Sequence, residues 1–565
     1  MNFFDIQVYS AIKLLLLLFV LISIYLIYKK KKPVYFLFLV GVVSATSFFI
    51  FVNNLQLPLF GLQGDEITLA AMYNTFAHVG FGADFAYHNL VSFYPPAFFW
   101  LFGIIGKILN INGVVIFKLA TFCFFLFFPL GLYYFQMFII KNKSYEDNWP
   151  QKLFMFLSPL LIITILDKDL MIGKPYEVIA AAATLFWAIS LYVKITQDKW
   201  NNKQLLIHGI IAGLIFMTYY LWLIFAAISL ILLGIFEKNN SKIKYFFRLF
   251  KTGLLSLVVA SPFLVPLIIS YLKNGMESWQ TAFFTPSGLD LWLPMFKFDN
   301  INSLILLFGL LILIYYRKRI FVRQLLYLFI TAFIWWAIGM TSLLIFKVPF
   351  QEFRGFYIWA PMILAISAAY GIERLFLHFR IRENKDVYIT LCVVGLIYFV
   401  SQSFFGFFID NSATKTFREG AKRISVPVSD LINYLKQDNQ TSSKLTLQTV
   451  PQILAYIPMN HLIYFNQHNN NPAAIFSKRF AYVQLLAKSK SADELYKNVK
   501  ASPYGNLERF IFYEDRNNYY LYFHLDKIIQ GIEVKEVIFS QNSFNSEHFK
   551  KVYEKDGYVV IDVIN

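Results

Sequence analysis

The first 409 residues alternate between long apolar runs and short polar segments. Many runs approach or exceed the ~18 apolar residues that mark a membrane-spanning helix. We expect spans near 8–28, 34–52, 113–140, 152–166, 176–195, 204–217, 220–236, 250–271, 301–316, 323–346, 356–377 and 387–409, with the weakest boundary at Thr218–Tyr220. The pattern predicts an α-helical polytopic membrane protein with about 12–13 transmembrane helices.

The apolar segment 94–109 is only marginally long enough to span, and Pro95 and Pro96 stand where prolines are tolerated, at a helix start. We place it in the membrane interface. Most loop Lys and Arg residues then share one side with Lys29–Lys32, and this side is predicted to be cytoplasmic. The segment 53–92, which contains no Lys or Arg, falls in a predicted external loop, 53–112.

From Asp410 onward hydrophobicity falls, which predicts a transmembrane domain, 1–409, and a small extracytoplasmic α/β domain, 410–565. Segments 444–450 and 557–564 alternate as strands do, and 508–526 reads as a hairpin turning at 516–518. Segments 425–438 and 491–499 are predicted helices, with Ser425 or Ser429 and Ser491 as N-caps.

Composition agrees with a membrane protein, because 58% of residues are hydrophobic and 15% are charged, against about 25% charged in a soluble domain. We attribute the net charge of +17 to basic cytoplasmic loops and expect no nucleic-acid partner, since no basic–aromatic platform accompanies it. The two cysteines lie in apolar runs and indicate no disulfide framework. We expect the first span to be retained, because Lys29–Lys32 follow it and no small-residue cleavage site is present.

Three predicted external loops carry charged residues next to apolar spans. These residues are Asp65 and Glu66 in the first loop, Lys174, Tyr176 and Glu177 in the second, and Glu352 and Arg354 in the third. Ionisable groups beside the hydrocarbon are costly, and they usually mark a site or a mutual salt bridge. We therefore expect the three loops to approach one another in space.

This set of side chains suits group transfer at the membrane edge. A carboxylate can take a proton from an attacking hydroxyl, and cations can stabilise a departing phosphate. Together they suggest sugar transfer from a polyprenyl-phosphate donor to an external hydroxyl, with no nucleotide site. A transporter would place ionisable groups near the midplane on broken helices or repeats, whereas these spans are nearly free of Asp and Glu. A non-catalytic assembly protein that binds cell-wall polymer is a third hypothesis.

Several motifs resemble known glycosyltransferases. "GDE" (64–66) and "FYPPAFFWL" (93–101) resemble the first external loop of GT-C membrane glycosyltransferases. "KPYEVIAA" (174–181), the His-x-x-x-Pro pattern of 468–472 before a helix, and the closing "FKKVYEKDGYVVIDV" (549–563) resemble the arabinofuranosyltransferase family that primes galactan in mycobacterial cell walls.

The resemblance implies a GT-C fold and an inverting pentosyltransferase of the cell membrane that moves arabinofuranose from a polyprenyl-phosphate sugar to a cell-envelope glycan. It implies that Asp65 is the general base, with Glu66 assisting it or binding the acceptor, and that Lys174 and Arg354 bind the donor phosphate. Tyr176, Glu177 and Glu352 would line the site. Transfer of a hexose, such as mannose, and transport of a lipid-linked sugar are the alternatives.

Structural explanations stand beside these roles. Asp65 and Glu66 could cap a helix, Lys174 could extend to the interface, and Glu352 and Arg354 could pair with each other.

Four further residues are assigned to substrate binding. His78 and His88 do not have a zinc spacing and are expected to bind sugar hydroxyls or water. Tyr94 lines the site or seats its ring at headgroup depth, and His468 reaches the acceptor or belongs to an ordinary polar loop. No cofactor is required by the sequence, although oxygen ligands would suit a divalent cation.

Overall fold

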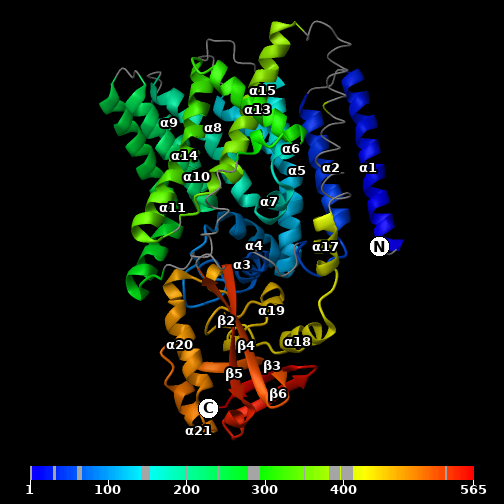
Figure 1. Cartoon of the computed structure of the whole chain (residues 1–565), viewed down its shortest axis with the longest axis vertical. Helices are drawn as coiled ribbons and strands as arrows, with labels where there is room; N and C mark the ends of the chain where they lie inside the picture. The colour runs from blue at the N-terminus through cyan, green and yellow to red at the C-terminus, as the bar shows by residue number, and fades with distance from the viewer. Residues whose placement is uncertain are drawn as a thin grey trace. The chain divides into compact units, whose positions relative to one another are not determined.

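A computed structural model describes residues 3–29, 33–59, 66–140, 153–196, 200–237, 241–277, 293–298, 300–348, 350–380, 395, 412–527 and 531–564 (Figure 1). The chain forms two compact units. The helical unit comprises Met1–Asn54, Leu119–Ser261 and Gly288–Thr416, and the sheet unit comprises Leu55–Lys118, Pro262–Ser287 and Phe417–Asn565. Asp65, the expected domain boundary at 409/410 and, apart from residue 395, the expected span 387–409 lie outside the described residues.

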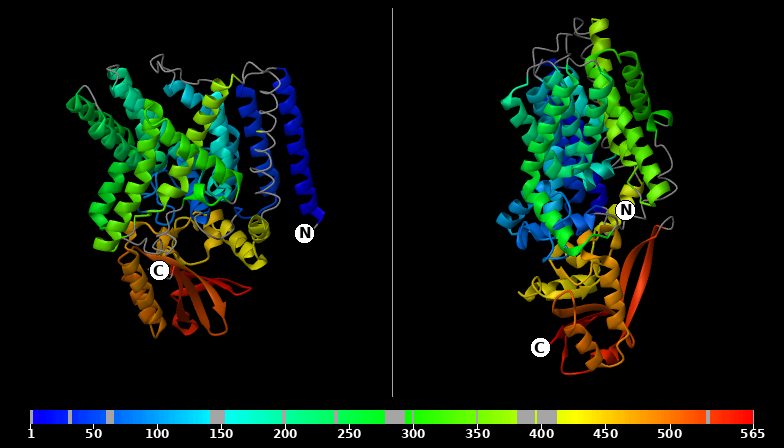
Figure 2. Two further views of the ribbon diagram at one scale, coloured as in Figure 1. Left: turned by 45° about the horizontal axis from the view of Figure 1, so that its top comes forward. Right: turned by 90° about the vertical axis from the view of Figure 1, so that its left-hand side faces the viewer.

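The helical unit is built from apolar helices that lie side by side (Figure 2). They are α1 (Phe3–Tyr28), α2 (Pro33–Val52), α5 (Gly113–Ile140), α6 (Leu153–Ile165), α7 (Lys168–Gly173), α8 (Pro175–Thr196), α9 (Asn202–Tyr219), α10 (Leu221–Phe236), α11 (Lys242–Asn274), η2 (Pro294–Phe296), α13 (Ile301–Tyr315), α14 (Ile320–Phe346), the π-helical η3 (Gly355–Trp359) and α15 (Ala360–His378). The first part of α5 and the last part of α11 belong to the sheet unit. The expected break near residue 219 is confirmed by the change from α9 to α10.

Seven of the described helices are long and apolar enough to cross a membrane: Asp5–Leu26, Val34–Val52, Gly113–Ile139, Pro175–Thr196, Lys242–Asn274, Ile320–Phe346 and Gly355–His378. Shorter apolar helices cover Ala97–Leu109, Phe154–Ile165, Leu221–Phe236 and Ile301–Tyr315. The predicted polytopic helical membrane protein with a C-terminal α/β region is therefore confirmed.

Small residues allow close packing between helices of this unit, as is common for helices in membranes. A Cβ atom at Gly309 of α13 would lie 2.2 Å from the Leu364 carbonyl oxygen of α15, so only glycine fits there. Ser367 donates to the Gly309 carbonyl at 2.9 Å. Trp222 of α10 and Trp359 of η3 stack in the same unit, with ring centroids 5.6 Å apart.

The sheet unit combines seven described strands with short helices. The strands are β1 (Leu445–Gln448), β2 (Asn460–His461), β3 (Leu507–Asp515), β4 (Asn518–Lys527), β5 (Gly531–Ser540), β6 (Phe549–Lys555) and β7 (Tyr558–Val563). The helices are α3 (Glu66–His78), α4 (Ala97–Leu109), α18 (Val426–Gln437), α19 (Pro451–Tyr456), α20 (Phe476–Ala487) and α21 (Ala492–Lys500), with α17 (Ser412–Ala421) at the unit boundary and the 3-10 turns η6 (Gln467–Asn469), η7 (Pro472–Ala474) and η8 (Gln541–Phe544).

The sheet runs in the order β2-β1-β3-β4-β5, and β7 pairs with both β3 and β6. β1 is parallel to β2 and β3, while the other pairs are antiparallel. Alternate residues of β3 and β4, among them Phe510, Phe512 and Leu521, form the core with α20 and α21 (Figure 1). The predicted strands, hairpin and helices of this region are confirmed, and Ser491 caps α21 by accepting from the Glu494 N–H at 3.2 Å.

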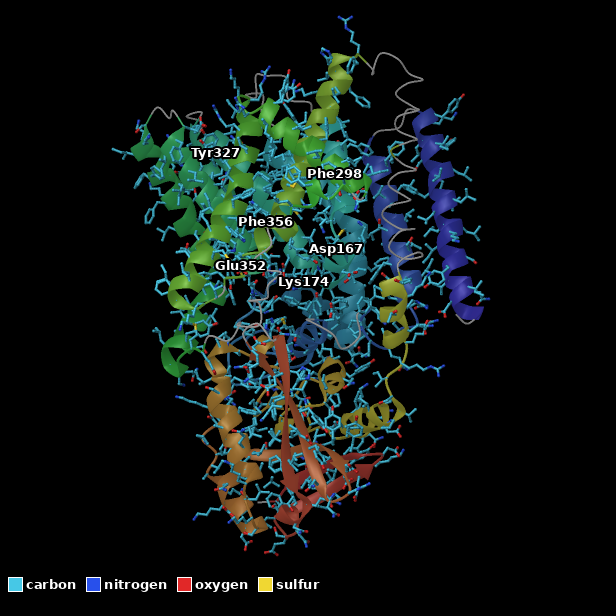
Figure 3. The ribbon with its side chains drawn as sticks, viewed as in Figure 1. Asp167, Lys174, Phe298, Tyr327, Glu352 and Phe356 are labelled. Carbon is cyan, nitrogen blue, oxygen red and sulfur yellow. The ribbon has the colours of Figure 1, made fainter. Side chains whose placement is uncertain are left out.

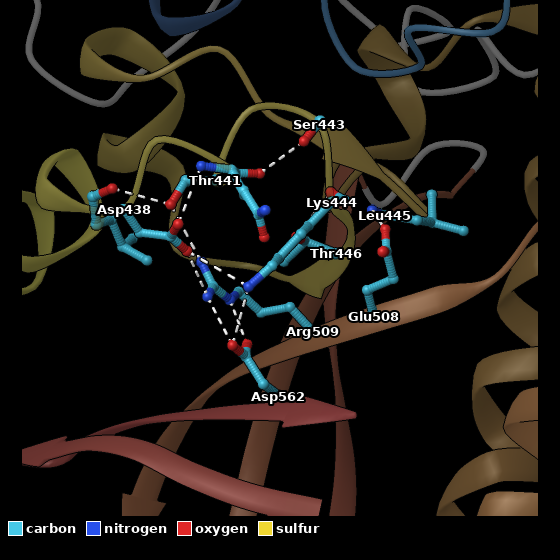
Figure 4. Close-up of polar contacts among 11 residues, drawn as sticks. Asp438, Thr441, Ser443, Lys444, Leu445, Thr446, Glu508, Arg509 and Asp562 are labelled. Carbon is cyan, nitrogen blue, oxygen red and sulfur yellow. Dashed lines mark hydrogen bonds and ion pairs between the residues drawn. The ribbon is translucent and has the colours of Figure 1, made fainter. Parts of the chain in front are cut away.

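A buried arginine ties the sheet to the loop before β1. Arg509 donates from Nε and Nη2 to the two oxygens of Asp562, at 2.6 and 2.9 Å, and from Nη2 to Asp438 at 2.7 Å (Figure 4). Lys444 lies 3.0 Å from Asp562, which adds a second cation. Burial raises the pKa of the Asp562 carboxyl, but hydrogen bonds from Arg509 and Lys444 offset this and bring the pKa below its usual value.

Candidate functional site

The second charged loop folds as a short helix followed immediately by a long one. Asp167 caps α7 by accepting from the Asp169 N–H at 3.0 Å, and the Lys174 N–H closes α7 on the Leu170 carbonyl at 2.7 Å. Pro175 then begins α8, where its fixed φ suits the first helical position. Glu177 therefore lies in the first turn of α8, where the helix dipole favours a carboxylate.

Arg354 joins the third charged loop to the second. Its Nη1 atom lies 2.6 Å from Glu177 Oε2, and the side chains of the pair are 6% and 0% exposed. Lys174 Nζ lies 3.9 Å from Glu177 Oε1, and Gln351 Oε1 accepts from Arg354 Nε at 2.9 Å. The expected approach of these two loops is confirmed. Lys174 and Arg354 are two cations around the single carboxylate of Glu177, so these three side chains together carry an excess of positive charge.

Further titratable groups surround this ion pair. Tyr357 lies within electrostatic range of Asp167, Asp169, Glu177 and Arg354. Burial, followed by the neighbouring Asp167, raises the pKa of Asp169 to about 6. Figure 3 shows Asp167, Lys174 and Glu352 in the same part of the helical unit.

Lys168 closes the end of α6. Its ammonium group donates to the carbonyls of Ile163, Thr164 and Leu166, where the helix end carries partial negative charge. Burial lowers the pKa of Lys168 to about 7, although Asp167 opposes the shift. This contact fixes the start of the loop that carries Lys174.

Glu352 is a buried carboxylate, 1% exposed, and it packs against Gly339 of α14. Its Oε1 atom has no hydrogen-bond partner among the described residues, and burial raises the pKa of the carboxyl. Gln351, beside it, has a φ of 52°, a left-handed conformation that is uncommon for a residue with a side chain. Tyr176 is fully buried, with its ring 5.8 Å from that of Tyr219.

The residues expected around the first loop belong to the sheet unit. Glu66 is the first residue of α3, so the predicted helix start is confirmed, while Asp65 lies outside the described residues. His78 ends α3, with Nε2 3.1 Å from the Ile111 carbonyl. Tyr94 packs its ring against Phe93 and Phe99, at centroid distances of 5.9 and 6.0 Å. The proposed roles of these residues stay predictions.

Two histidines of the sheet unit lie within electrostatic range of each other. The His88 N–H donates to Asn460 Oδ1 at 3.1 Å, and burial lowers the pKa of His88 to about 4. His461 is fully buried, and burial together with His88 lowers its pKa to about 3. Both rings are therefore neutral at pH 7. His461 was not identified from the sequence.

His468 lies on η6, with Nδ1 2.9 Å from Asp526 Oδ2, so this residue forms a contact within the sheet unit. The described residues hold no group of three or more His, Cys, Asp or Glu side chains placed for a metal ion. A divalent cation stays a prediction.

The asparagines after His468 form a polar junction with the segment 66–92, in the same unit. Asn471 Nδ2 donates to Asp84 Oδ2 at 3.0 Å, and the Tyr87 hydroxyl donates to Asn470 Oδ1 at 2.5 Å. Asp84 is fully buried and also accepts from the Ala86 and Tyr87 N–H groups, at 3.0 and 3.2 Å. Sequence reasoning missed Asp84 and Tyr87, because their partners lie hundreds of positions away.

Comparison with protein families gives one match to the helical region. Residues 161–397 match the family model described as the N-terminal part of arabinofuranosyltransferases. Lys174, Glu177, Glu352 and Arg354 all lie within this segment. The expected resemblance to arabinofuranosyltransferases is thereby confirmed for residues 161–397, and it supports a glycosyltransferase. A comparison with curated proteins gave no match.

The solved structures that match this chain include three of low identity. AglB, an oligosaccharyltransferase from Archaeoglobus fulgidus in complex with an inhibitory peptide and a dolichol-phosphate, is 11% identical, with a TM-score of 0.46 over 92% of this chain and 80% of its own. ArnT from Cupriavidus metallidurans, bound to undecaprenyl phosphate, is 11% identical with a TM-score of 0.49, and the match covers 92% of this chain and 97% of ArnT. The arabinofuranosyltransferase AftD from Mycobacteria is 10% identical with a TM-score of 0.43, and the match covers 90% of this chain and 40% of AftD.

Proposed function

We propose that the protein transfers a pentose, arabinofuranose, from a polyprenyl-phosphate sugar to a hydroxyl of a cell-envelope glycan at the external face of the cell membrane. The observation that carries this proposal is the group formed by Lys174, Glu177 and Arg354, inside the segment that matches arabinofuranosyltransferases. Two cationic side chains held at one carboxylate suit an anionic phosphate.

Lys174 and Arg354 have different tasks in this proposal. Arg354 is held by Glu177 and Gln351, so its guanidinium group is oriented before the donor arrives. Lys174 is 23% exposed and ends α7, where a flexible ammonium group can follow the phosphate oxygens. Cations fixed in a site that excludes water stabilise a leaving phosphate more strongly than they would in water.

The reaction is a single displacement with inversion. The oxygen of the acceptor hydroxyl attacks the anomeric carbon as the bond between this carbon and the phosphate oxygen breaks. The hydroxyl proton passes to Asp65, assisted by Glu66, and the lipid phosphate leaves with the bonding electrons towards Lys174 and Arg354. Tyr176, Glu177 and Glu352 line the site around the sugar. The carboxylate of Asp65 can take the proton because the attacking hydroxyl becomes more acidic in the transition state.

The test offers the purified full-length protein a panel of polyprenyl-phosphate sugars and measures release of the lipid phosphate. We expect consumption of the arabinofuranose donor, and loss of this activity in Asp65→Asn with folding nearly intact. Asp493→Asn, an exposed carboxylate of α21, is the matched control. Consumption of a hexose donor alone would refute the pentose, and consumption of no donor would refute the transferase.

A further inference from the structure

A groove of about 490 Å³ lies on the sheet unit. Four tyrosines and four carboxylates line it with Gly557, and none of these nine residues is basic. The tyrosines are Tyr513, Tyr520, Tyr522 and Tyr558. This composition contrasts with the chain as a whole, which has a net charge of +17.

The strand register explains why the rings gather. Tyr513 of β3 is paired with Tyr520 of β4 and with Tyr558 of β7, so three neighbouring strands each contribute one tyrosine to a single cross-strand row. Because side chains alternate along a strand, this row lies on the sheet face opposite the core residues Phe512 and Val559.

Three of the four rings pack on one another. The Tyr513 ring lies 5.2 Å from the rings of both Tyr522 and Tyr558, at interplanar angles of 67° and 47°. In such tilted arrangements the rings pack on one another, whereas a cage for a cation needs several ring faces turned to one point. The tyrosines therefore offer both ring faces and ring edges to a ligand that lies along the row.

The carboxylates stand around the row of tyrosines. Asp515 ends β3 at the β3–β4 turn, Asp556 lies in the β6–β7 turn, and Glu536 of β5 pairs in register with Tyr522. Tyr522 is within electrostatic range of both Glu536 and Asp515. Carboxylates accept strong hydrogen bonds from hydroxyl groups, and they surround an aromatic surface here.

We propose that this groove binds a neutral oligosaccharide. The C–H faces of the sugar rings lie on the tyrosines, whose ring faces carry partial negative charge, and the sugar hydroxyls donate to Asp515, Glu536 and Asp556. The groove is separate in sequence from the residues assigned to transfer, and binding in it needs no donor. That the oligosaccharide is part of the acceptor chain rests on the proposed function.

The test measures binding to the full-length protein in detergent, without donor, by calorimetry. The probes are linear arabino- and galacto-tetrasaccharides, with tetramethylammonium as the cationic probe. We expect at least one tetrasaccharide to bind, and Tyr520→Ser to weaken this binding by about tenfold, as expected for one aromatic contact. Glu536→Gln on the exposed part of β5 is expected to weaken it as well, without touching the core.

The matched control is Tyr434→Ser, a half-buried tyrosine of the same unit that packs on Tyr553 at 4.8 Å outside the groove. It is expected to bind as the parent does. Binding of tetramethylammonium alone, binding of no tetrasaccharide, or equal binding by the parent and both groove variants would overturn the proposal. Because the assay contains no donor, Asp65→Asn should bind normally, and this separates the groove from the transfer reaction.

Discussion

Arg354 and Glu177 form a buried ion pair that joins positions 177 residues apart, with 2.6 Å between Nη1 and Oε2. The pair fixes the loop before α8 against the loop before η3. The sequence had also allowed an ion pair between Arg354 and its near neighbour Glu352, but Arg354 pairs with Glu177.

Arg354→Met is expected to destabilise the protein by about 3–5 kcal/mol, because Glu177 would keep a buried charge without its main partner. Thermal unfolding in detergent measures this. The double variant Arg354→Met/Glu177→Gln should recover part of the loss, since no uncompensated charge remains. Arg354→Lys should also lack sugar transfer, because an ammonium group cannot bind a phosphate with two parallel hydrogen bonds as the planar guanidinium group does. An unfolding temperature of the Arg354→Met variant equal to that of the parent would contradict the assignment.

Lys174→Met is expected to reduce sugar transfer by about 10²–10³-fold, as the loss of one charge-stabilising group does at other active sites. Its effect on stability should be below about 1 kcal/mol, because the 3.9 Å contact with Glu177 is long and Lys174 is partly exposed. Initial rates at saturating donor measure the effect. Lys203→Met, on the exposed start of α9, is the control and should transfer at the parent rate.

Gly339→Ala should disturb the third loop through packing alone. A Cβ atom at Gly339 would lie 2.6 Å from Glu352 Cβ, so the loop that carries Glu352 has to shift, at a cost of roughly 1–3 kcal/mol. Unfolding and transfer assays are both expected to show a loss. Gly253→Ala is the matched control, because nothing lies within 4 Å of its added Cβ. Equal behaviour of the two variants would argue against a tight Glu352 contact.

Asp84 is expected to make the stability of the sheet unit depend on pH. Burial raises the pKa of Asp84 to about 7, although hydrogen bonds from Ala86, Asn471 and Tyr87 oppose the shift. Between about pH 4 and 7 the folded protein therefore holds a proton that the unfolded chain has released. The free energy of unfolding should fall as the pH rises through this range.

Asp84→Asn should flatten this slope, because the amide does not titrate. It should also lower stability by about 1–3 kcal/mol, since its amide group would face the donor amide of Asn471. Unfolding at a series of pH values measures both effects. A variant with the parent's slope would show that another group is responsible.

Arg509→Met should make the sheet unit sensitive to acid. The lowered pKa values of Asp438 and Asp562 contribute stability that is present above about pH 4 and is lost as the pH falls through their folded pKa values. Without Arg509 these carboxyls should take up protons at higher pH, so the midpoint of acid unfolding should rise. Loss of near-UV circular dichroism during an acid titration measures this, and an unchanged midpoint would contradict the role of Arg509.

Local patterns predicted much of the fold. Apolar runs identified the helices, and alternation identified β1, β7 and the β3–β4 hairpin, because these signals lie within a few residues of one another. The approach of the Lys174 and Arg354 loops also followed from the sequence, since both were assigned to one membrane face.

Local sequence patterns could not predict which residues contact each other across long distances in the chain. The pairing of Arg354 with Glu177 and of Asp84 with Asn471 depends on tertiary contacts between segments far apart in the chain. The same holds for the electrostatic influence of His88 on His461. Each residue alone is an ordinary polar residue near an apolar segment. The row of tyrosines was hidden for the same reason, because it arises only when β4, β3 and β7 come into register.

The Asn471–Asp84 contact, which spans 387 positions, has a consequence for biosynthesis. A ribosome adds about 5–20 residues per second, so the segment around Asp84 waits for roughly 20–80 s before its partner emerges. During that interval the apolar side chains of α3 lack the surface that later covers them. We therefore expect a chain truncated before residue 471 to leave these side chains uncovered and to be degraded faster than the full-length chain.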